Sequence, residues 1–515
     1  MKRLLLYFQL FIIFSSSLFA QDISSGVKLI RDEKYAQAKN TFNSLLNGES
    51  KAEAYFYLGE IYFFQSKIDS AKQFYEKGIA ADKELALNYA GLVRVNLFQK
   101  NSAEAEKNYN QALELGEDIP QVYIVLAEAY SSEYGGKNYD KSINLLNEAL
   151  KINPQSVKAY VVLGNVYLAN GNGSEAIKNF QRAIDIDGTN PEPMTRKAKV
   201  YILIGNYEQA NILLTEAIKI DPSYSPAYSE IAELNATTKN YLNAAEYYSQ
   251  HIEASEITLE KQKRFASILY MNKEYEKTIN ILKDVISKEP DNASSIRILA
   301  YSYLRLDDIE NSKSYFQKLF EIPSVDYLPT DYENYADLLS KTGNDSLAID
   351  YLYKIVELDS LRKDVYGDIS ILYFKNKKWN GVISALESKG ELTAQEYFDL
   401  GKAYYFIQDY TKADSAFNLL SAKVPDLAIA YFWRARVQTN FDPESEQGLA
   451  KPYYEQFLSV SGEDTTKFKK ELIEAYSYLG YYFYLKEDPR SKEYWLKVEA
   501  IDPENQQAKA ALKEL

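Results

Sequence analysis

One pattern returns at a nearly constant spacing along this chain: a tyrosine, a leucine three residues later, a glycine beside it, and a second tyrosine. One copy spans residues 55–62, and Tyr89 begins the next copy 34 residues after Tyr55. Further clean copies begin at Tyr160 and Tyr397. A repeat of this length is typical of a solenoid, in which each repeat buries its apolar surface against its neighbours. The spacing therefore constrains the fold more strongly than the composition does.

Each repeat is predicted to be a helical hairpin. We number a repeat from three residues before its first tyrosine, so that positions 4, 7, 8 and 11 lie on one face of a helix. Positions 20, 24, 27 and 28 mark one face of a second helix, and a short polar connection, such as residues 65–67, separates the two helices.

Two positions stay small and a third is often proline. Positions 8 and 20 hold Gly, Ala or Ser in most repeats. Helix axes about 8–10 Å apart tolerate only small side chains where they approach most closely, so we expect both positions at the crossing of the two helices. Position 32 is Pro154, Pro222 and Pro290 in three repeats, and proline ends a helix because it lacks the N–H that the helix interior needs.

These residues make the chain similar to the tetratricopeptide repeat family, which has Leu-Gly, Tyr, Ala and Pro at the same places of a 34-residue pattern. About fourteen repeats fit one register, starting near residues 19, 52, 86, 120, 157, 191, 225, 259, 293, 329, 363, 394, 428 and 473. The resemblance implies an all-α fold, a right-handed superhelical solenoid of antiparallel helix pairs, whose first helices line a concave groove that binds partner segments. We expect the solenoid at residues 21–438, an irregular, loop-rich break at 439–466, and a last repeat with a C-terminal capping helix at 467–515.

The first twenty residues differ from the repeats. Lys2 and Arg3 precede an apolar run at residues 4–14, and small residues lead to Ala20. This order predicts a secretory signal peptide cleaved after Ala20, and with it a periplasmic protein that has no membrane span in its mature chain. Release from the cell is one alternative. An uncleaved N-terminal anchor on a membrane-attached adaptor is another, although the apolar run is shorter than the about 20 residues of a membrane span.

Composition removes several classes of function. The chain has no cysteine, so thiol catalysis and thiolate metal sites are excluded. Its formal charge is −14, which becomes −16 when Lys2 and Arg3 are removed, and this sign disfavours nucleic acid as a partner. The single histidine, His251, falls at position 27, where we expect a packing residue. The acidic segment at residues 185–190 is expected to be a turn. No catalytic residue, cofactor or metal ligand is predicted.

The candidate site is a set of aromatic and basic residues. In the resembled family, positions 2, 5, 9 and 12 of the first helix face the groove. Toward the C-terminus these positions hold Phe374, Phe398, Lys402, Tyr405, Phe432, Arg436, Tyr481 and Tyr484, and a smaller set near the N-terminus comprises Phe56, Phe63 and Arg94. Rigid rings beside a cation suit an extended peptide, because the rings bury much area and the cation binds a carboxylate. Packing between repeats is the alternative for position 12.

The sequence therefore predicts a non-enzymatic scaffold of the bacterial cell envelope, which binds partner proteins or peptides. A carbohydrate or peptidoglycan binder is the second interpretation, because aromatic side chains also stack on sugar rings. A third is an enzyme whose site lies in the irregular C-terminal part.

Overall fold

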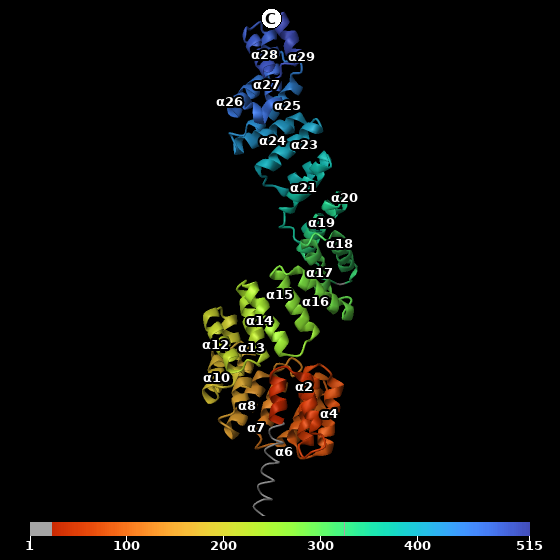
Figure 1. Ribbon diagram of the computed structural model, residues 1–515, viewed down its shortest axis with the longest axis vertical. Coiled ribbons are helices and arrows are strands. Elements are labelled where there is room, and N and C mark those ends of the chain that lie inside the picture. Colours follow the sequence, from red (N-terminus) through yellow and green to blue (C-terminus); the bar gives the residue numbers. More distant parts are fainter. Residues whose placement is uncertain (1–22, 324) are drawn as a thin grey trace, which may run out of the picture. The chain divides into compact units, whose positions relative to one another are not determined.

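The computed structural model describes residues 23–323 and 325–515, and these are largely helical, with no strand among them. Figure 1 shows helices that follow one another as antiparallel pairs. After a helical segment at residues 23–31, the first helices of the repeats are α3 (Lys51–Phe64), α5 (Ala86–Phe98), α7 (Pro120–Ser131), α9 (Val157–Ala169), α11 (Pro191–Leu203), α13 (Ser225–Thr237), α15 (Leu259–Met271), α17 (Ala293–Arg305), α19 (Pro329–Lys341), α21 (Val365–Lys375), α23 (Ala394–Phe406), α25 (Ala428–Phe441) and α27 (Thr465–Leu485). The second helices are α2 (Tyr35–Ser44), α4 (Ile68–Ala81), α6 (Ser102–Leu115), α8 (Tyr139–Ile152), α10 (Gly173–Ile186), α12 (Tyr207–Ile220), α14 (Tyr241–Ala254), α16 (Tyr275–Lys288), α18 (Ile309–Glu321), α20 (Asp345–Leu358), α22 (Trp379–Lys389), α24 (Tyr410–Lys423), α26 (Lys451–Ser461) and α28 (Arg490–Ile501).

The predicted register is confirmed along most of the chain. The first helices α5, α7, α9, α11, α13, α15, α17, α19, α23 and α25 begin at the residue where the sequence pattern starts a repeat. From α3 to α16 and from α19 to α28, the two helices of each hairpin lie against each other, and each hairpin contacts the next one. The fold is therefore an all-α solenoid of helix pairs.

The small residue at position 8 makes room for an aromatic ring at position 24 of the same repeat. A Cβ atom placed on Gly59 would lie 2.4 Å from the Tyr75 ring. The same relation joins Gly401 to Phe417, where that distance is 2.6 Å. In these repeats glycine leaves the space that the large ring of the second helix occupies at the crossing, as close helix packing requires.

The connections also follow the predicted pattern. The turn inside a repeat places position 15 at positive φ, with 58° at Ser66, 58° at Lys100 and 77° at Gly171. Between repeats, Pro154 and Pro222 follow helices that end at Ile152 and Ile220. Proline therefore lies in the turn between repeats, where its missing N–H leaves no helical hydrogen bond unmade.

Two compact units make up the chain, one ending at Ser302 and the other running from Tyr303 to Leu515. We call them the N-terminal unit and the C-terminal unit. In the N-terminal unit, one apolar cluster runs without interruption from Phe56 to Val166, across four repeats. In the C-terminal unit, a second cluster runs from Val382 to Ala508. Within each of these two clusters, neighbouring repeats thus share a continuous core.

The expectation of an irregular break at residues 439–466 was wrong in part. This segment contains α26, which packs against α25 as the second helix of its repeat. Its apolar side chains, Tyr454 and Phe457, are buried in the C-terminal cluster. The pattern was missed because the repeat carries an unusually long turn, in which Asp442 accepts a hydrogen bond from the Gly448 N–H at 2.7 Å.

Helix α29 (Gln506–Glu514) ends the array and packs against α28, as expected of a capping helix. Within the described residues, no helix combines the length and the apolar character that crossing a membrane requires. The predicted signal peptide, residues 1–20, lies outside the described residues.

Candidate partner-binding surfaces

Most of the predicted aromatic and basic residues of the C-terminal unit gather around one tryptophan, Trp433 of α25. The Lys402 ammonium lies 5.1 Å from the ring centre of Phe374, 5.3 Å from that of Phe398 and 5.5 Å from that of Trp433. These three rings come from three successive first helices, so the repeat packing itself builds the cluster. We call it the Lys402 cluster.

Lys402 is a half-buried cation with an unusual surrounding. Among the ion pairs of the described residues it has no carboxylate partner, and its nearest recorded neighbours are the three rings. Burial lowers the pKa of Lys402; Asp399 opposes this effect, and Arg436 adds to it. Cation–π contacts stabilise the ammonium group only in part. The cost of burying the Lys402 charge is therefore only partly offset within the protein, and a carboxylate of a partner could offset more of it.

Arg436 lies next to this cluster but is already paired. Its guanidinium donates to both carboxylate oxygens of Glu474, with distances of 2.7 Å and 2.5 Å, and stands over the rings of Phe432 and Trp433. The Tyr454 hydroxyl donates to the same carboxylate at 3.0 Å. Because its charge is matched inside the protein, Arg436 orients this surface and is less available to a partner than Lys402.

Tyr405 borders the Lys402 cluster. Its ring is half-buried and meets Trp433 edge to face, with centroids 5.3 Å apart. Its hydroxyl oxygen lies 3.5 Å from the Asn440 amide nitrogen, which donates to it. The Tyr405 ring thus supports Trp433.

A groove of about 810 Å³ lies between α27 and the capping helix α29. Tyr481 and Tyr484, three residues apart on α27, line it and are 41% and 45% exposed. Glu474 and Trp495 contribute to the same wall. The groove therefore offers aromatic surface, the Glu474 carboxylate that Arg436 already neutralises, and the side chains of Lys470 and Glu514.

Three residues of the predicted sets are buried and cannot contact a partner. Phe432 is 3% exposed, because its ring packs on Phe457 in the core between α25 and α26. Phe56 is buried in the N-terminal cluster, and Arg94, 2% exposed, is enclosed between two glutamates. Only Phe63 of that smaller set stays partly exposed.

Trp433 was missed because it stands at position 6, outside the four positions taken to face the groove. Its side chain is largely buried, yet one face supports Lys402 and Arg436. A tryptophan is rare in this chain, which has three, and that rarity is the signal that could have drawn attention to it.

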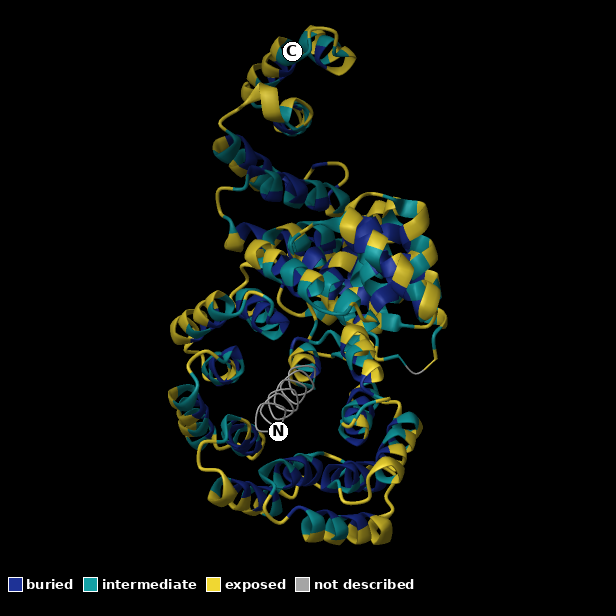
Figure 2. Ribbon diagram, turned by 60° about the horizontal axis from the view of Figure 1, so that its bottom comes forward, coloured by how far each residue is buried: buried dark blue, intermediate teal, exposed yellow. Residues whose placement is uncertain are grey.

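The N-terminal unit surrounds a cavity of about 1010 Å³, around which its helices follow one another in a ring (Figure 2). Charged residues from several first helices line it, among them Glu60, Glu128, Lys158 and Glu192. Glu128 lies 3.0 Å from Arg94 and 3.7 Å from Lys158, so charges of opposite sign alternate along the wall. The wall thus combines apolar and charged side chains, and its charges largely neutralise one another.

His251 is buried near this cavity, as its packing position predicted. Its Nδ1 lies 3.0 Å from the carbonyl oxygen of Ser225, which makes Nδ1 the donor, and its ring packs edge to face on Tyr248. Burial and the nearby Lys261 lower the pKa of His251, so the ring is neutral at physiological pH. It serves as a packing and hydrogen-bonding residue.

The acidic segment at residues 185–190 consists of the last two residues of α10 and the turn that follows it. The Asp187 carboxylate accepts hydrogen bonds from the Thr189 N–H at 3.0 Å and from its hydroxyl at 2.7 Å, and Asn190 caps α11. Across residues 23–323 and 325–515, no group of three or more His, Asp or Glu side chains is placed to hold a metal ion.

Comparison with known proteins agrees with the repeat frame. Models described as tetratricopeptide repeat match residues 168–234, 52–85 and 298–325, and one described as TPR repeat matches residues 131–171. The TPR repeat-containing protein YpiA of Bacillus subtilis is 23% identical over 346 residues, which cover 66% of this chain and 70% of that protein. The BBSome complex member BBS4 homolog of Drosophila melanogaster is 21% identical over 290 residues, and the match spans 53% of this chain and 58% of that protein, less than two thirds of its length.

Among solved structures, the C-terminal part of a TPR repeat-containing protein from Cytophaga hutchinsonii is 31% identical in sequence. The match covers 48% of this chain and 99% of that chain, with a TM-score of 0.41. Together with the helix pairs and their 34-residue register, the sequence matches show that the chain belongs to the tetratricopeptide repeat family.

Proposed function

We propose that this protein is a non-enzymatic scaffold of the bacterial cell envelope, which binds an extended, carboxylate-bearing peptide segment of a partner protein at the Lys402 cluster. Tetratricopeptide repeats are protein-interaction modules, which supports the general role. The choice of site rests on Lys402 itself, a half-buried cation among three rings that has no carboxylate partner in the described part of the chain.

The chemistry of the cluster favours a peptide with an acidic and an apolar or aromatic residue. A carboxylate next to Lys402 would form a charge-assisted hydrogen bond in a partly desolvated place, where such bonds are stronger than in water. Apolar side chains would cover the exposed edges of Phe374 and Tyr405, which gain from burial. The Tyr481–Tyr484 groove, built by the next repeat, would take the continuation of the segment.

Photo-crosslinking in cells tests the site. A photoreactive amino acid replaces Tyr405 or Tyr481 in turn, and Leu419, an exposed residue of α24, serves as the position outside the groove. We expect the same partner to be captured from the first two positions and not from the third. Capture from Leu419 alone would rule out the groove.

Charge removal then tests the role of Lys402. Lys402→Met should abolish that capture, and Lys377→Met, which removes an exposed lysine from a turn of the same unit, should leave it intact. If capture persists in both Lys402→Met and Phe398→Ala, the Lys402 cluster is not the binding site.

The envelope setting rests on the basic start and the apolar run of residues 1–20. Cleavage after Ala20 would give a mature protein that begins at Gln21 and is released from cells by osmotic shock. Edman sequencing of the released protein tests this directly. Retention of residues 1–20 in the membrane fraction would instead support the anchored adaptor.

Carbohydrate binding is the second candidate function, and the exposed pair of Tyr481 and Tyr484 favours it. Two tyrosines on one helix face, at the side of an open groove, can stack on successive sugar rings. Sedimentation of the mature protein with purified peptidoglycan separates the two functions. Co-pelleting that Tyr481→Ala abolishes and Lys402→Met does not would favour the sugar ligand.

A further inference from the structure

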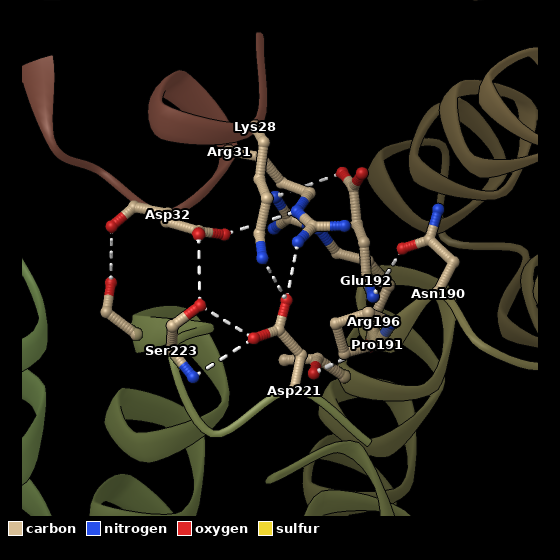
Figure 3. A network of polar contacts seen from close by, with 11 residues as sticks. Lys28, Arg31, Asp32, Asn190, Pro191, Glu192, Arg196, Asp221 and Ser223 are labelled. Carbon is tan, nitrogen blue, oxygen red and sulfur yellow. Dashed lines mark hydrogen bonds and ion pairs between the residues drawn. The ribbon is translucent and has the colours of Figure 1, made fainter. Parts of the chain in front are cut away.

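The first repeat contacts a part of the chain that lies about five repeats further along (Figure 3). The Arg31 guanidinium donates to the Asp221 carboxylate at 2.8 Å across 190 residues of sequence, and the Lys28 ammonium lies 3.4 Å from the same oxygen. The Ser223 hydroxyl donates to the Asp32 carboxylate at 3.3 Å. We call the contacts between residues 28–36 and residues 221–261 the seam.

Backbone groups extend the seam beyond these side chains. The Glu33 carbonyl accepts a hydrogen bond from the Glu256 N–H at 3.0 Å, and the Glu256 carboxylate accepts one from the Ala36 N–H at 2.8 Å. The Lys261 ammonium lies 2.7 Å from the Glu33 carboxylate. The seam thus joins two distant repeats through matched polar groups, and it closes the N-terminal unit around its central cavity.

The cores on the two sides of the seam are separate. The apolar cluster around Phe42 in the first repeat draws its members from residues 23–74. The cluster around Tyr224 on the other side draws its members from residues 184–227. Several repeats that are neighbours in sequence share one core, as in the cluster from Phe56 to Val166. At the seam, by contrast, the two cores are joined by the polar contacts described above.

This difference decides where the ring separates most readily. Polar contacts between partly exposed groups exchange for contacts with water at little net cost, and salt screens their charges. Apolar contacts between neighbouring repeats have no such substitute, because separating them exposes their surface to water. Burial raises the pKa of the Asp32 carboxyl, which is 2% exposed, so its surroundings disfavour its charge.

We propose that the N-terminal unit is a ring that opens and closes at the seam and thereby controls sideways access to its central cavity. A closed ring admits a polypeptide only by threading of a free end, whereas an open seam admits an internal segment. The cavity, lined by residues from both sides of the seam such as Arg31, Glu128 and Arg264, is complete only when the seam is closed. This device is independent of the function proposed for the C-terminal unit.

Spin labels across the seam test the proposal on the full mature chain. The chain has no cysteine, so Gln37→Cys and Ile257→Cys, both at exposed positions, introduce the only two thiols. We expect one short label-to-label distance at low salt. A second, longer distance should appear in about 1 M NaCl, and it should dominate when Asp221→Asn and Lys261→Met are combined.

Asp187→Asn is the matched control. Asp187 occupies the same position one repeat earlier, and it accepts the Thr189 N–H at 3.0 Å just as Asp221 accepts the Ser223 N–H at 3.0 Å. Both substitutions keep that turn, but only Asp221 faces the first repeat. The control should keep the short distance, and circular dichroism should show both variants folded.

Hydrogen exchange gives a second measurement without labels. The amides of Ala36 and Glu256, which donate across the seam, should exchange at least about tenfold faster in the Asp221→Asn, Lys261→Met variant, while amides of α9 keep their rates. A single short distance that neither salt nor the double variant changes, with unchanged exchange, would show a permanently closed ring and overturn the proposal. A long label-to-label distance in the Asp187→Asn control would show that opening does not depend on the seam contacts, and it would overturn the assignment of the opening to the seam.

Discussion

Gly164 and Phe180 occupy the crossing of the two helices in their repeat so closely that a Cβ atom on Gly164 would lie 2.5 Å from the Phe180 ring. Real Cβ atoms do not approach other atoms so closely. In the next repeat the same two positions are Ala198 and Leu214, both buried. These two repeats thus solve the same packing problem with two different pairs, glycine with a large ring and alanine with a smaller side chain.

Gly164→Leu should overpack this crossing. We expect a loss of about 1–3 kcal/mol in the free energy of unfolding, because the ring has no space into which it can shift without disturbing its neighbours. Chemical denaturation followed by circular dichroism measures this loss. A denaturation curve that matches the wild type would contradict the assigned crossing.

The pair Gly164→Ala and Phe180→Leu provides the control for that prediction. Each single variant should destabilise the protein, the first through a clash and the second through a cavity. The double variant reproduces the pair Ala198 and Leu214, so it should recover part of the stability. A purely additive double-mutant cycle would show that the two positions do not share one space.

Arg94 is the central residue of a buried ionic network in the N-terminal unit. Its guanidinium donates to both oxygens of Glu60, at 3.0 and 2.8 Å, and to Glu128 at 3.0 Å, and the Tyr75 hydroxyl donates to Glu60 at 2.6 Å. Arg94→Met would leave the Glu60 carboxylate buried without its cation. We expect a loss of about 3–5 kcal/mol in the free energy of unfolding, as is typical when one partner of a buried pair is removed.

The neutral triple variant tests that reasoning. Arg94→Met combined with Glu60→Gln and Glu128→Gln removes the charges together, so it should be clearly more stable than Arg94→Met alone, as thermal melting would show. Equal melting temperatures would mean that the packing of the Arg94 stem, and not its charge, stabilises this region.

The fold of the repeats was predictable because each repeat carries its own local signals. Small residues at position 8, polar residues in the turns, and prolines such as Pro222 after the second helix all act within about forty residues of sequence. The long turn before α26 hid the second helix of its repeat, since the spacing there departs from the pattern. The seam was not predictable at all, because nothing near Arg31 or Asp221 in sequence indicates that the two side chains meet.

The candidate site was predictable only in outline. Family positions brought Lys402 and Phe398 to one surface, and the structure places them together. The same positions misplaced Phe432, because the local packing of α25 on α26 turns position 5 into the core in that repeat. Position in a repeat fixes which helix face a residue occupies, but the neighbouring repeats decide whether that face stays open.

Asp488 should titrate with an unusually low pKa. The Arg490 guanidinium donates to it at 3.0 and 2.7 Å and the Arg490 N–H donates at 3.0 Å, and these hydrogen bonds lower the pKa of Asp488 to about 2. Because the pKa is depressed on folding, this group stabilises the fold at neutral pH, and the contribution is lost as the pH falls from about 3.9 through about 2.

A carboxyl-carbon NMR titration of aspartate-labelled protein checks this value. Arg490→Met should raise the pKa of Asp488 only part of the way to its usual value, because the backbone N–H of residue 490 still donates to it. An unchanged pKa in that variant would show that the guanidinium is not the cause.

Lys402→Met separates binding from stability, because the two should respond in opposite directions. Burial lowers the pKa of Lys402, which means that the folded protein disfavours its ammonium form. The wild-type protein therefore gains stability as the pH rises from the folded pKa of this lysine toward the ordinary value of about 10.4, and the methionine variant lacks that gain.

At pH 7 the methionine side chain packs among the same three rings without a charge to desolvate, so the melting temperature should be unchanged or higher while partner capture is lost. A variant that loses both capture and stability would identify Lys402 as a structural residue of the C-terminal core. If Lys402 weakens the fold and serves binding, the variant should lose partner capture and keep or raise its melting temperature. Thermal melting, measured beside the crosslinking assay, distinguishes these two outcomes.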